Sequence, residues 1–223
     1  MKLLTFFLVL AAVPVFAQSK PGFGAGEGVN GQVLAIVVQK DGKVVIGGAF
    51  TAVNGVSRQN LARLNRDGSL DEGFLAQAEL GPNGPVAALL VLPDGGILAG
   101  GNFSSACNLA RRNLVKILAD GTADAKFGAQ EGGDATNGPI AALALEPDGN
   151  ILVGGAFTAF YGTVRRGIAR LNPDGGLVAG PRQSNTLTGR VAALGICPDG
   201  SAIAGGKISD SSQNARGILR LSH

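Results

Sequence analysis

Histidine and the large aromatic residues are almost absent from this chain of 223 residues. The only histidine is the last residue, His223, tryptophan is missing, and tyrosine occurs once. A single terminal histidine excludes, within one chain, a Ser/His/Asp triad, a Cys/His pair and a multi-histidine metal site. The 19 basic and 16 acidic residues nearly balance, the basic ones form no run, and there is almost no aromatic surface for base stacking. We therefore expect no nucleic-acid partner.

Residues 1–17 (MKLLTFFLVLAAVPVFA) have the pattern of a secretory signal peptide. They combine a basic start at Lys2, an apolar run that is short for a bilayer span, and Val15 and Ala17 at the small-residue positions before the expected cleavage point. A retained membrane anchor is the alternative, but the polar, Pro/Gly-rich sequence after Ala17 favours cleavage. We expect a mature domain of residues 18–223 without a stable membrane span, which is secreted, periplasmic or at the cell surface.

One pattern recurs four times along the mature chain: an apolar run, an Asp-Gly pair, a second apolar run and a Gly-Gly pair. Its copies are residues 33–50, 86–103, 140–157 and 191–208. The Asp residues of the four Asp-Gly pairs are 53, 54 and 51 residues apart, and a second Asp-Gly follows 26 residues later in the first three units. A fixed period of this size predicts a repeat architecture. The units are about 33–85, 86–139, 140–190, and 191–223 together with 20–32.

Each unit is predicted to form two β-hairpins, because Asp-Gly between short β-prone runs is a strong signal for a tight hairpin turn. In the second unit the four strands are expected at residues 86–92, 97–103, 113–118 and 122–127. The first strand is apolar on both faces, so it is expected to be buried between stacked sheets. The Gly-Gly pairs would let these sheets approach closely, with Phe50, Phe103 and Phe157 in equivalent inter-sheet sites. The prediction is an all-β protein, a β-propeller of four four-stranded antiparallel blades.

The two ends of the mature chain suggest how the ring closes. The last unit lacks its fourth strand, and Lys20–Phe23 resembles the end of a unit, so the N-terminal segment could supply the missing outer strand. The alternative is a larger ring shared by two copies, so we expect a monomer or a homodimer. Cys107 and Cys197 fall at opposite ends of neighbouring strands in non-adjacent units, so we expect two free thiols.

The composite motif of the first unit resembles a known family. Within Asp41–Phe74 the order is DGK, GGxF, NG, an arginine, LARLNxDGSLD and Phe, which is similar to the delta-60 repeat of bacterial proteins. The resemblance covers almost the whole mature chain. It implies a β-propeller fold and export, and it carries no agreed activity. The last unit departs from the motif, because Ile208 replaces the Phe and the second Asp-Gly is absent.

Arginines recur just before the third strand of each unit and suggest a binding rim. These residues, with two further arginines beside them, are Arg58, Arg111, Arg112, Arg165, Arg166 and, shifted by one position, Arg216. They lie in loops that vary between units, whereas the opposite face has uniform Asp-Gly turns, and recognition usually sits in variable loops on a rigid scaffold. Such a rim could bind carboxylate or sulfate groups of an acidic glycan. The alternative is structural: a residue that occurs once per repeat can hold the repeat together. A second basic position recurs inside the third strand, at Arg63, Lys116, Arg170 and Arg220.

Acidic residues give weaker signals. Segments 65–71 and 120–124 loosely resemble calcium loops, but the bidentate glutamate is missing and Val178 replaces an aspartate in the third copy, so we interpret them as hairpin turns and expect no metal. Glu27, Glu79, Glu131 and Asp134 lie in the variable loops and could serve a carbohydrate-active enzyme, although nothing pairs them.

The sequence thus favours an exported, non-catalytic binding or structural module without cofactors. Its variable-loop face would recognise a glycan or another protein at the cell exterior. An extracellular carbohydrate-active enzyme that uses the loop carboxylates is the alternative.

Overall fold

The computed structural model of the chain describes residues 26–75, 80–129, 134–181, 187–209 and 215–221. These residues form β-strands, turns and irregular segments but no α-helix, and none of them forms a helix that could cross a membrane. The main strands make four antiparallel sheets of three strands, which we call blades 1 to 4. Their bounds are β1 (Gln32–Val38), β2 (Val44–Ala49) and β5 (Leu61–Leu64) in blade 1; β6 (Val86–Val91), β7 (Ile97–Gly101) and β10 (Leu114–Ile117) in blade 2; β11 (Ile140–Leu145), β12 (Ile151–Gly155) and β15 (Ile168–Leu171) in blade 3; β16 (Thr188–Ile196), β17 (Ala202–Ser209) and β18 (Ala215–Leu221) in blade 4.

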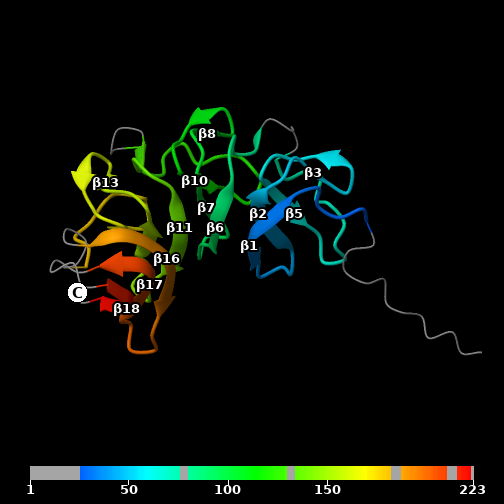
Figure 1. The fold of residues 1–223 in the computed structure, drawn as a ribbon. Helices are drawn as coiled ribbons and strands as arrows, with labels where there is room; N and C mark the ends of the chain where they lie inside the picture. The colour runs from blue at the N-terminus through cyan, green and yellow to red at the C-terminus, as the bar shows by residue number, and fades with distance from the viewer. Residues whose placement is uncertain (1–25, 76–79, 130–133, 182–186, 210–214, 222–223) are drawn as a thin grey trace, which may run out of the picture.

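The blades stand side by side in chain order along an open arch (Figure 1). The first strand of each blade packs against the first strand of the next, so β1 contacts β6, β6 contacts β11 and β11 contacts β16. Face-to-face packing of small antiparallel sheets around an axis is the β-propeller arrangement. The predicted all-β propeller architecture is therefore confirmed.

The Asp-Gly pairs form the predicted hairpin turns. In blade 2, the Asp94 side chain accepts a hydrogen bond from the backbone N–H of Gly96 over 2.9 Å, and Gly95 has a φ of 83°. A left-handed backbone at this position favours glycine, and an aspartate at the turn satisfies a backbone donor that the ladder does not pair. Local turn chemistry therefore fixes the pairing of β6 with β7.

In blades 1 to 3 the fourth strand is shorter than predicted. After the second Asp-Gly turn, pairing with the third strand is reduced to single bridges, Leu64 with Leu70, Ile117 with Ala123 and Leu171 with Leu177. In blade 1 the chain then turns, and the backbone N–H of Phe74 bonds the carbonyl of Asp71 over 3.2 Å. This turn places the Phe74 side chain in the core between blades 1 and 2, where it is completely buried. Burying a large aromatic side chain stabilises the fold more than extending an edge strand would.

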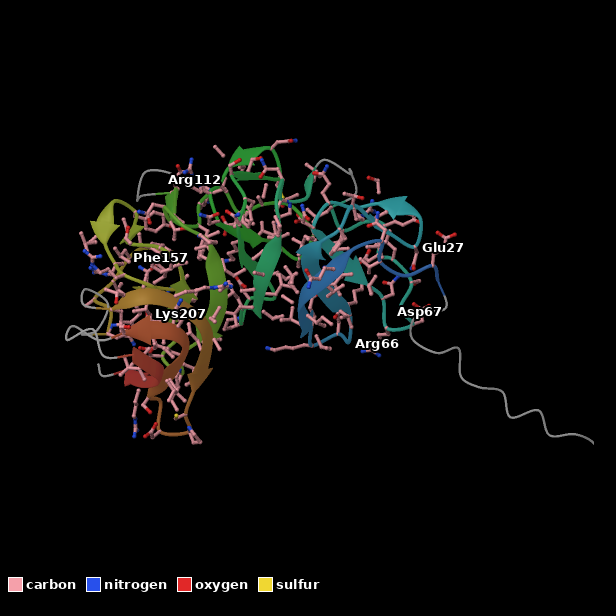
Figure 2. The ribbon with its side chains drawn as sticks, viewed as in Figure 1. Glu27, Arg66, Asp67, Arg112, Phe157 and Lys207 are labelled. Atoms are coloured by element: carbon pink, nitrogen blue, oxygen red, sulfur yellow. The ribbon has the colours of Figure 1, made fainter. Side chains whose placement is uncertain are left out.

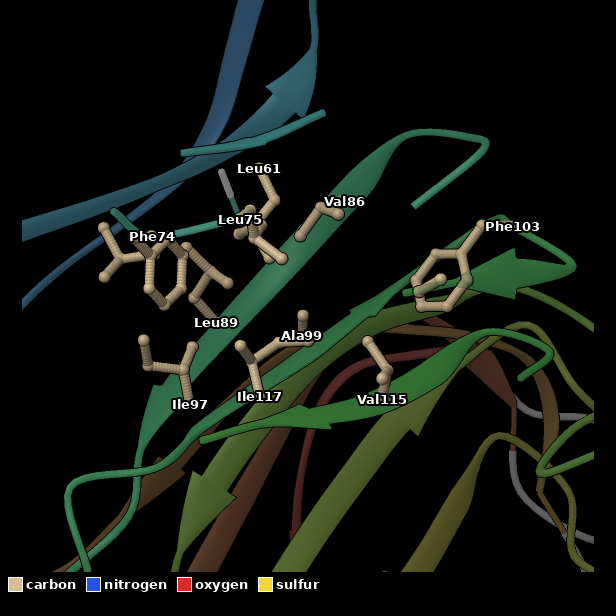
Figure 3. Close-up of a cluster of buried hydrophobic side chains, with 12 residues drawn as sticks. Leu61, Phe74, Leu75, Val86, Leu89, Ile97, Ala99, Phe103, Val115 and Ile117 are labelled. Atoms are coloured by element: carbon tan, nitrogen blue, oxygen red, sulfur yellow. The ribbon is translucent and has the colours of Figure 1, made fainter. Parts of the chain in front are cut away.

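Glycine permits the close approach of neighbouring blades. A Cβ atom on Gly100 would lie 2.6 Å from Cγ2 of Ile140 in the next blade, and one on Gly47 would lie 2.6 Å from Cγ1 of Val86. Against these flat surfaces the first strand of the following blade buries its side chains. Figure 3 shows the resulting cluster between blades 1 and 2, with Leu61 and Phe74 near Val86 and Leu89.

The first strand of a blade is buried on both faces inside the arch, as predicted, but not at the blade 1 end. Val86 is inaccessible to solvent, and β6 has no exposed residue. In β1, by contrast, Leu34, Ile36 and Val38 are 43 %, 63 % and 65 % exposed, because no described sheet packs on that side. The segment Lys20–Phe23, predicted to complete the last blade, lies outside the described residues. Both cysteines are free, as expected.

Candidate functional site

The connections between the second and third strands carry small hairpins that the sequence analysis treated as loops. They are β3 (Ala52–Val53) with β4 (Val56–Ser57), β8 (Ser105–Ala106) with β9 (Leu109–Ala110), and β13 (Ala159–Phe160) with β14 (Thr163–Val164). Both turn residues of each hairpin have positive φ, as in Cys107 and Asn108 with 52° and 59°. This geometry matches the twist of paired strands and favours Asn and Gly. The Asn54-Gly55 pair was the signal for it in the sequence.

An asparagine clamps each hairpin to the start of its blade. The Asn83 side-chain oxygen accepts hydrogen bonds from the backbone N–H groups of Ser104 and Ser105, at 2.9 and 3.1 Å, and its amide donates to the Ser104 hydroxyl at 2.9 Å. Asn30 and Asn137 make the same contacts in blades 1 and 3. In blades 1 to 3 these side chains therefore hold the described hairpins of the variable-loop face in place. The recurring Asn-Gly pairs that begin with these three residues were the available signal.

In blades 1 to 3 the once-per-repeat arginines donate hydrogen bonds to backbone carbonyl groups on this face. Arg58 is only 4 % exposed and donates to the carbonyl oxygens of Ser57 and Glu72, at 2.8 and 3.1 Å. Arg111 donates to the carbonyl of Ala125 in the equivalent way, at 2.8 Å. In blade 3 Arg165 donates to the carbonyl of Val164, at 2.9 Å. These contacts agree with the structural alternative for this register, and the Arg216 side chain lies outside the described residues.

The adjacent arginines point to a different role, because they are exposed. Nε of Arg112 lies 3.1 Å from a carboxylate oxygen of Asp134, and the two side chains are 50 % and 56 % exposed. Arg166 is the equivalent residue of blade 3 and is also exposed. Figure 2 places Arg112 on the side of the arch that carries hairpins β8–β9 and β13–β14. An ion pair this exposed is weak, so its guanidinium can exchange partners.

Arg112 borders two recesses between blades 2 and 3. The larger has a volume of about 470 Å³ and is lined by Asn83, Asn102, Phe103, Ser104, Arg112, Asn113, Asn137, Gly138 and Pro139. The smaller, of about 180 Å³, is lined by Arg112, Asp134, Ala135, Thr136, Asn137, Ala159, Tyr161 and Gly162. Asn102 is exposed and stands where blades 1 and 3 have Ala49 and Ala156. Asn102 occupies the variable position of the GGxF motif and adds a polar side chain to the larger recess.

The second basic register lies at the opposite face and forms structural ion pairs. In blade 1, Arg63 and Lys43 reach one carboxylate oxygen of Asp71, at 2.8 and 2.7 Å, and the Arg63 guanidinium lies 4.3 Å from the ring centroid of Phe74. Burial alone would raise the pKa of Asp71, but the hydrogen bonds from Lys43 and Arg63 outweigh it, so the pKa lies below its usual value.

Blade 2 keeps the acid equivalent to Asp71, which is Asp124, and adds Asp94, whereas blade 3 uses other acids. Lys116 contacts Asp94 at 2.6 Å and Asp124 at 3.4 Å. In blade 3 Val178 replaces the acid of the fourth segment, and Arg170 instead binds Glu146, whose side chain is only 2 % exposed. In blades 1 to 3 the basic residue at this position therefore contacts at least one carboxylate.

The two remaining acidic candidates that the structure describes do not form a site. Glu27 is exposed and Asp134 pairs with Arg112, whereas Glu79 and Glu131 lie outside the described residues. Within the described ranges no group of three or more His, Cys, Asp or Glu residues is placed to hold a metal ion. Asp67, in one calcium-like segment, accepts hydrogen bonds from the hydroxyl and backbone N–H of Ser69, which lower its pKa. That contact is typical of a turn residue.

Comparison with known proteins gives matches to one family of repeats and a shared fold. Residues 39–74, 92–127 and 146–177 match the family described as "Domain of unknown function (DUF5122) beta-propeller". No curated protein sequence matches the chain. Among solved structures, the WD40 β-propeller domain of Doa1 is similar, with 15 % identity over 86 % of this chain and a TM-score of 0.54. The extracellular domain of a putative hybrid two-component system, BT4673 from B. thetaiotaomicron, is similar over 90 % of this chain, with 17 % identity and a TM-score of 0.53.

Both structural likenesses are too distant to show more than a shared fold. The chain spans 51 % of the Doa1 chain and 22 % of the BT4673 chain. The three matched segments each begin close to the first Asp-Gly turn of a unit and end near the close of its fourth segment. They therefore have the period of the repeat inferred from the sequence, and they cover the second and third strands of blades 1 to 3. The chain is a β-propeller repeat protein whose repeats match a family of unknown function.

Proposed function

We propose that this protein is an exported, non-catalytic binding module that recognises an acidic glycan at the cell exterior, and that its repeats are delta-60 repeats. The observation that carries the proposal is the 470 Å³ recess between blades 2 and 3, on the variable-loop face. A recess of this size is within the usual range for small-molecule sites. A recess of this shape can enclose one or a few sugar units, whereas a protein partner would present a flatter surface.

The lining of the recess supplies the chemistry that an acidic sugar needs. Arg112 offers a half-exposed guanidinium, which is suited to planar bonding of a carboxylate. Asn102 offers an exposed amide and Ser104 a hydroxyl, which can bond sugar hydroxyl groups. A ligand carboxylate would exchange with Asp134 at Arg112, and the loss of this exposed ion pair would cost little.

The clamped hairpins support the same role. Ser104 is fixed through both its backbone and its hydroxyl by Asn83, and Asn113 is buried and bonded on both sides of the recess. A recess whose walls are held before binding loses less conformational entropy when the ligand enters. The site is therefore built on the rigid part of the blade rather than on a free loop.

The test is calorimetric titration of the purified protein with uronic-acid oligosaccharides and with the same oligosaccharides after reduction of their carboxyl groups. Binding is expected for the acidic probes alone. Arg112→Gln should weaken binding about 10- to 100-fold, the loss expected for a hydrogen bond to a charged group. Asn102→Ala, which restores the residue of the neighbouring blades, should weaken it about fivefold. Lys40→Gln, an exposed lysine beside an Asp-Gly turn, is the matched charge control and should bind normally.

Two outcomes would contradict the proposal. If no acidic oligosaccharide binds, or if Arg112→Gln binds as well as the unaltered protein, the recess is not a glycan site. If the incubated glycans release new reducing ends, and Glu27→Gln, Glu79→Gln or Glu131→Gln stops this release, the protein is a carbohydrate-active enzyme.

A further inference from the structure

The three interfaces inside the arch use the same contact. The first glycine of each Gly-Gly pair faces two apolar side chains of the following blade. A Cβ on Gly100 would lie 2.6 Å from Ile140 and 3.5 Å from Leu143, and one on Gly154 would lie 2.7 Å from Val191 and 3.2 Å from Leu194. Gly47 faces Val86 and Leu89 in the same way. Two apolar side chains on a bare glycine are thus the standard joint between blades.

At the blade 4 end this joint is half-formed. A Cβ on Gly205 would meet, among the described residues, only Ala193 and the carbonyl of Gly217, both 3.9 Å away and both in blade 4 itself. Beside it Ile218 is 68 % exposed. The residues at the same repeat position in the other blades, Leu61, Leu114 and Ile168, are at most 3 % exposed because the next blade covers them. Blade 4 therefore presents the glycine and the apolar side chain of a joint that no described residue completes.

The blade 1 end presents the other half. Val33 and Ile36 stand at the repeat positions of Val86 and Leu89, the pair that packs on the glycine of the preceding blade. Leu89 is 9 % exposed in its joint, whereas Ile36 is 63 % exposed, and Val38 beside it is 65 % exposed. An exposed apolar face of this kind, on a strand that no described blade covers, is unusual for a surface in contact with water.

We infer that these two faces bind each other between two copies of this chain, with Ile36 of one copy on Gly205 and Ile218 of the other. The two faces carry the residue types of the joint that the chain already forms three times, a glycine beside an apolar side chain on one face and apolar side chains on the other, so a second copy needs no new recognition chemistry. In a dimer with two-fold symmetry, the blade 1 face of each copy packs on the blade 4 face of the other. Both open faces of both copies are then covered, and the assembly is closed. Two open arches of four blades (Figure 1) then make one ring of eight, within the usual range for propellers.

The experiment measures the solution mass of the purified protein by size-exclusion chromatography with light scattering, over a 100-fold range of concentration. The unaltered protein is expected at twice the chain mass. Ile36→Glu and Ile218→Lys, each of which places a charge in both joints of the ring, should each halve the mass. Because Ile36 and Ile218 are exposed within one chain, each variant should still fold, with an unchanged circular dichroism spectrum and a cooperative unfolding transition.

Val164→Glu is the matched control, since Val164 is an equally apolar residue, 55 % exposed, on hairpin β13–β14 and away from both end faces. It should remain a dimer. A monomeric unaltered protein would overturn the inference, because it would mean that the two faces meet within one chain or stay open. A dimer that persists in both Ile36→Glu and Ile218→Lys, or open multimers in place of a dimer, would also overturn it.

Discussion

The side-chain amide of Asn113, in blade 2, donates a hydrogen bond to the carbonyl oxygen of Gly138, at the start of blade 3, over 3.0 Å. The side-chain oxygen of the same residue accepts from the backbone N–H of Phe103, over 3.1 Å, within its own blade. Asn113 is 4 % exposed and has a left-handed backbone, with a φ of 66°. One buried side chain therefore ties two blades together beside the recess that we propose as the binding site.

Replacing Asn113 separates its two contributions. Asn113→Ala should reduce the free energy of unfolding by roughly 3 kcal/mol, because buried groups lose their partners and alanine is strained at positive φ. Asn113→Gly also loses the hydrogen bonds but tolerates this backbone, so it should be about 1 kcal/mol more stable than the alanine variant. Blade 3 has Gly167 at this position, with a φ of 70°. Urea unfolding of both variants is the measurement, and equal stabilities would contradict the backbone argument.

Gly100 should not tolerate even one methyl group. Gly100→Ala places a Cβ 2.6 Å from Cγ2 of Ile140, a distance that forces the blades apart, and should lower the free energy of unfolding by roughly 1–3 kcal/mol. The control is Gly73→Ala, where the nearest atom would be a carboxylate oxygen of Asp71 at 3.7 Å. Thermal unfolding should show a fall in Tm for the first variant and little change for the second. A Tm of Gly100→Ala that matches the control would show that the joint is loosely packed.

Asp71 should make stability depend on pH in the acidic range. Its pKa in the folded protein lies below the usual 3.8, so its contribution is complete above that value and is lost as the pH falls through the folded pKa. Asp71→Asn should lower stability at neutral pH by roughly 2 kcal/mol, since it removes a carboxylate from Lys43 and Arg63. The variant should then lose less stability than the unaltered protein as the pH falls below 3.8.

Urea unfolding at several pH values tests this prediction, with Glu72→Gln as an exposed neighbouring control. Parallel stability curves for Asp71→Asn and the unaltered protein would contradict the assigned role of the ion pair.

The Cys107 thiol should be unreactive in the folded protein. Burial raises its pKa to about 11, so almost none of it is thiolate at pH 8. Alkylation by iodoacetamide, followed by peptide mass spectrometry, should label this residue slowly at pH 8 and quickly in urea. Labelling at the same rate in both conditions would show that hairpin β8–β9 opens readily.

The repeat and its hairpins could be predicted from the sequence, because a tight turn depends on a few neighbouring residues. Asp94 and Gly95 determine their turn through one side-chain contact and one backbone angle, both of which are local. The outcome for Arg112 was less predictable. It was grouped with Arg58 by position, yet one is half-exposed at a recess and the other is buried against carbonyl groups. Adjacent residues on an extended chain point in opposite directions, and which direction meets a cavity depends on the next blade.

The sequence by itself determined the period, the all-β character, the Asp-Gly turns and the glycine joints, since each follows from local backbone preference or from a repeated apolar pattern. Tertiary structure alone decided that the fourth segment turns inward to bury Phe74, that Asn102 and Arg112 share a recess, and that Ile36 and Ile218 remain exposed. These features depend on which surfaces meet, and the packing of one blade on another is a long-range property that no single repeat encodes. Equivalent repeat positions are therefore buried where two blades meet and exposed on the open faces of blades 1 and 4.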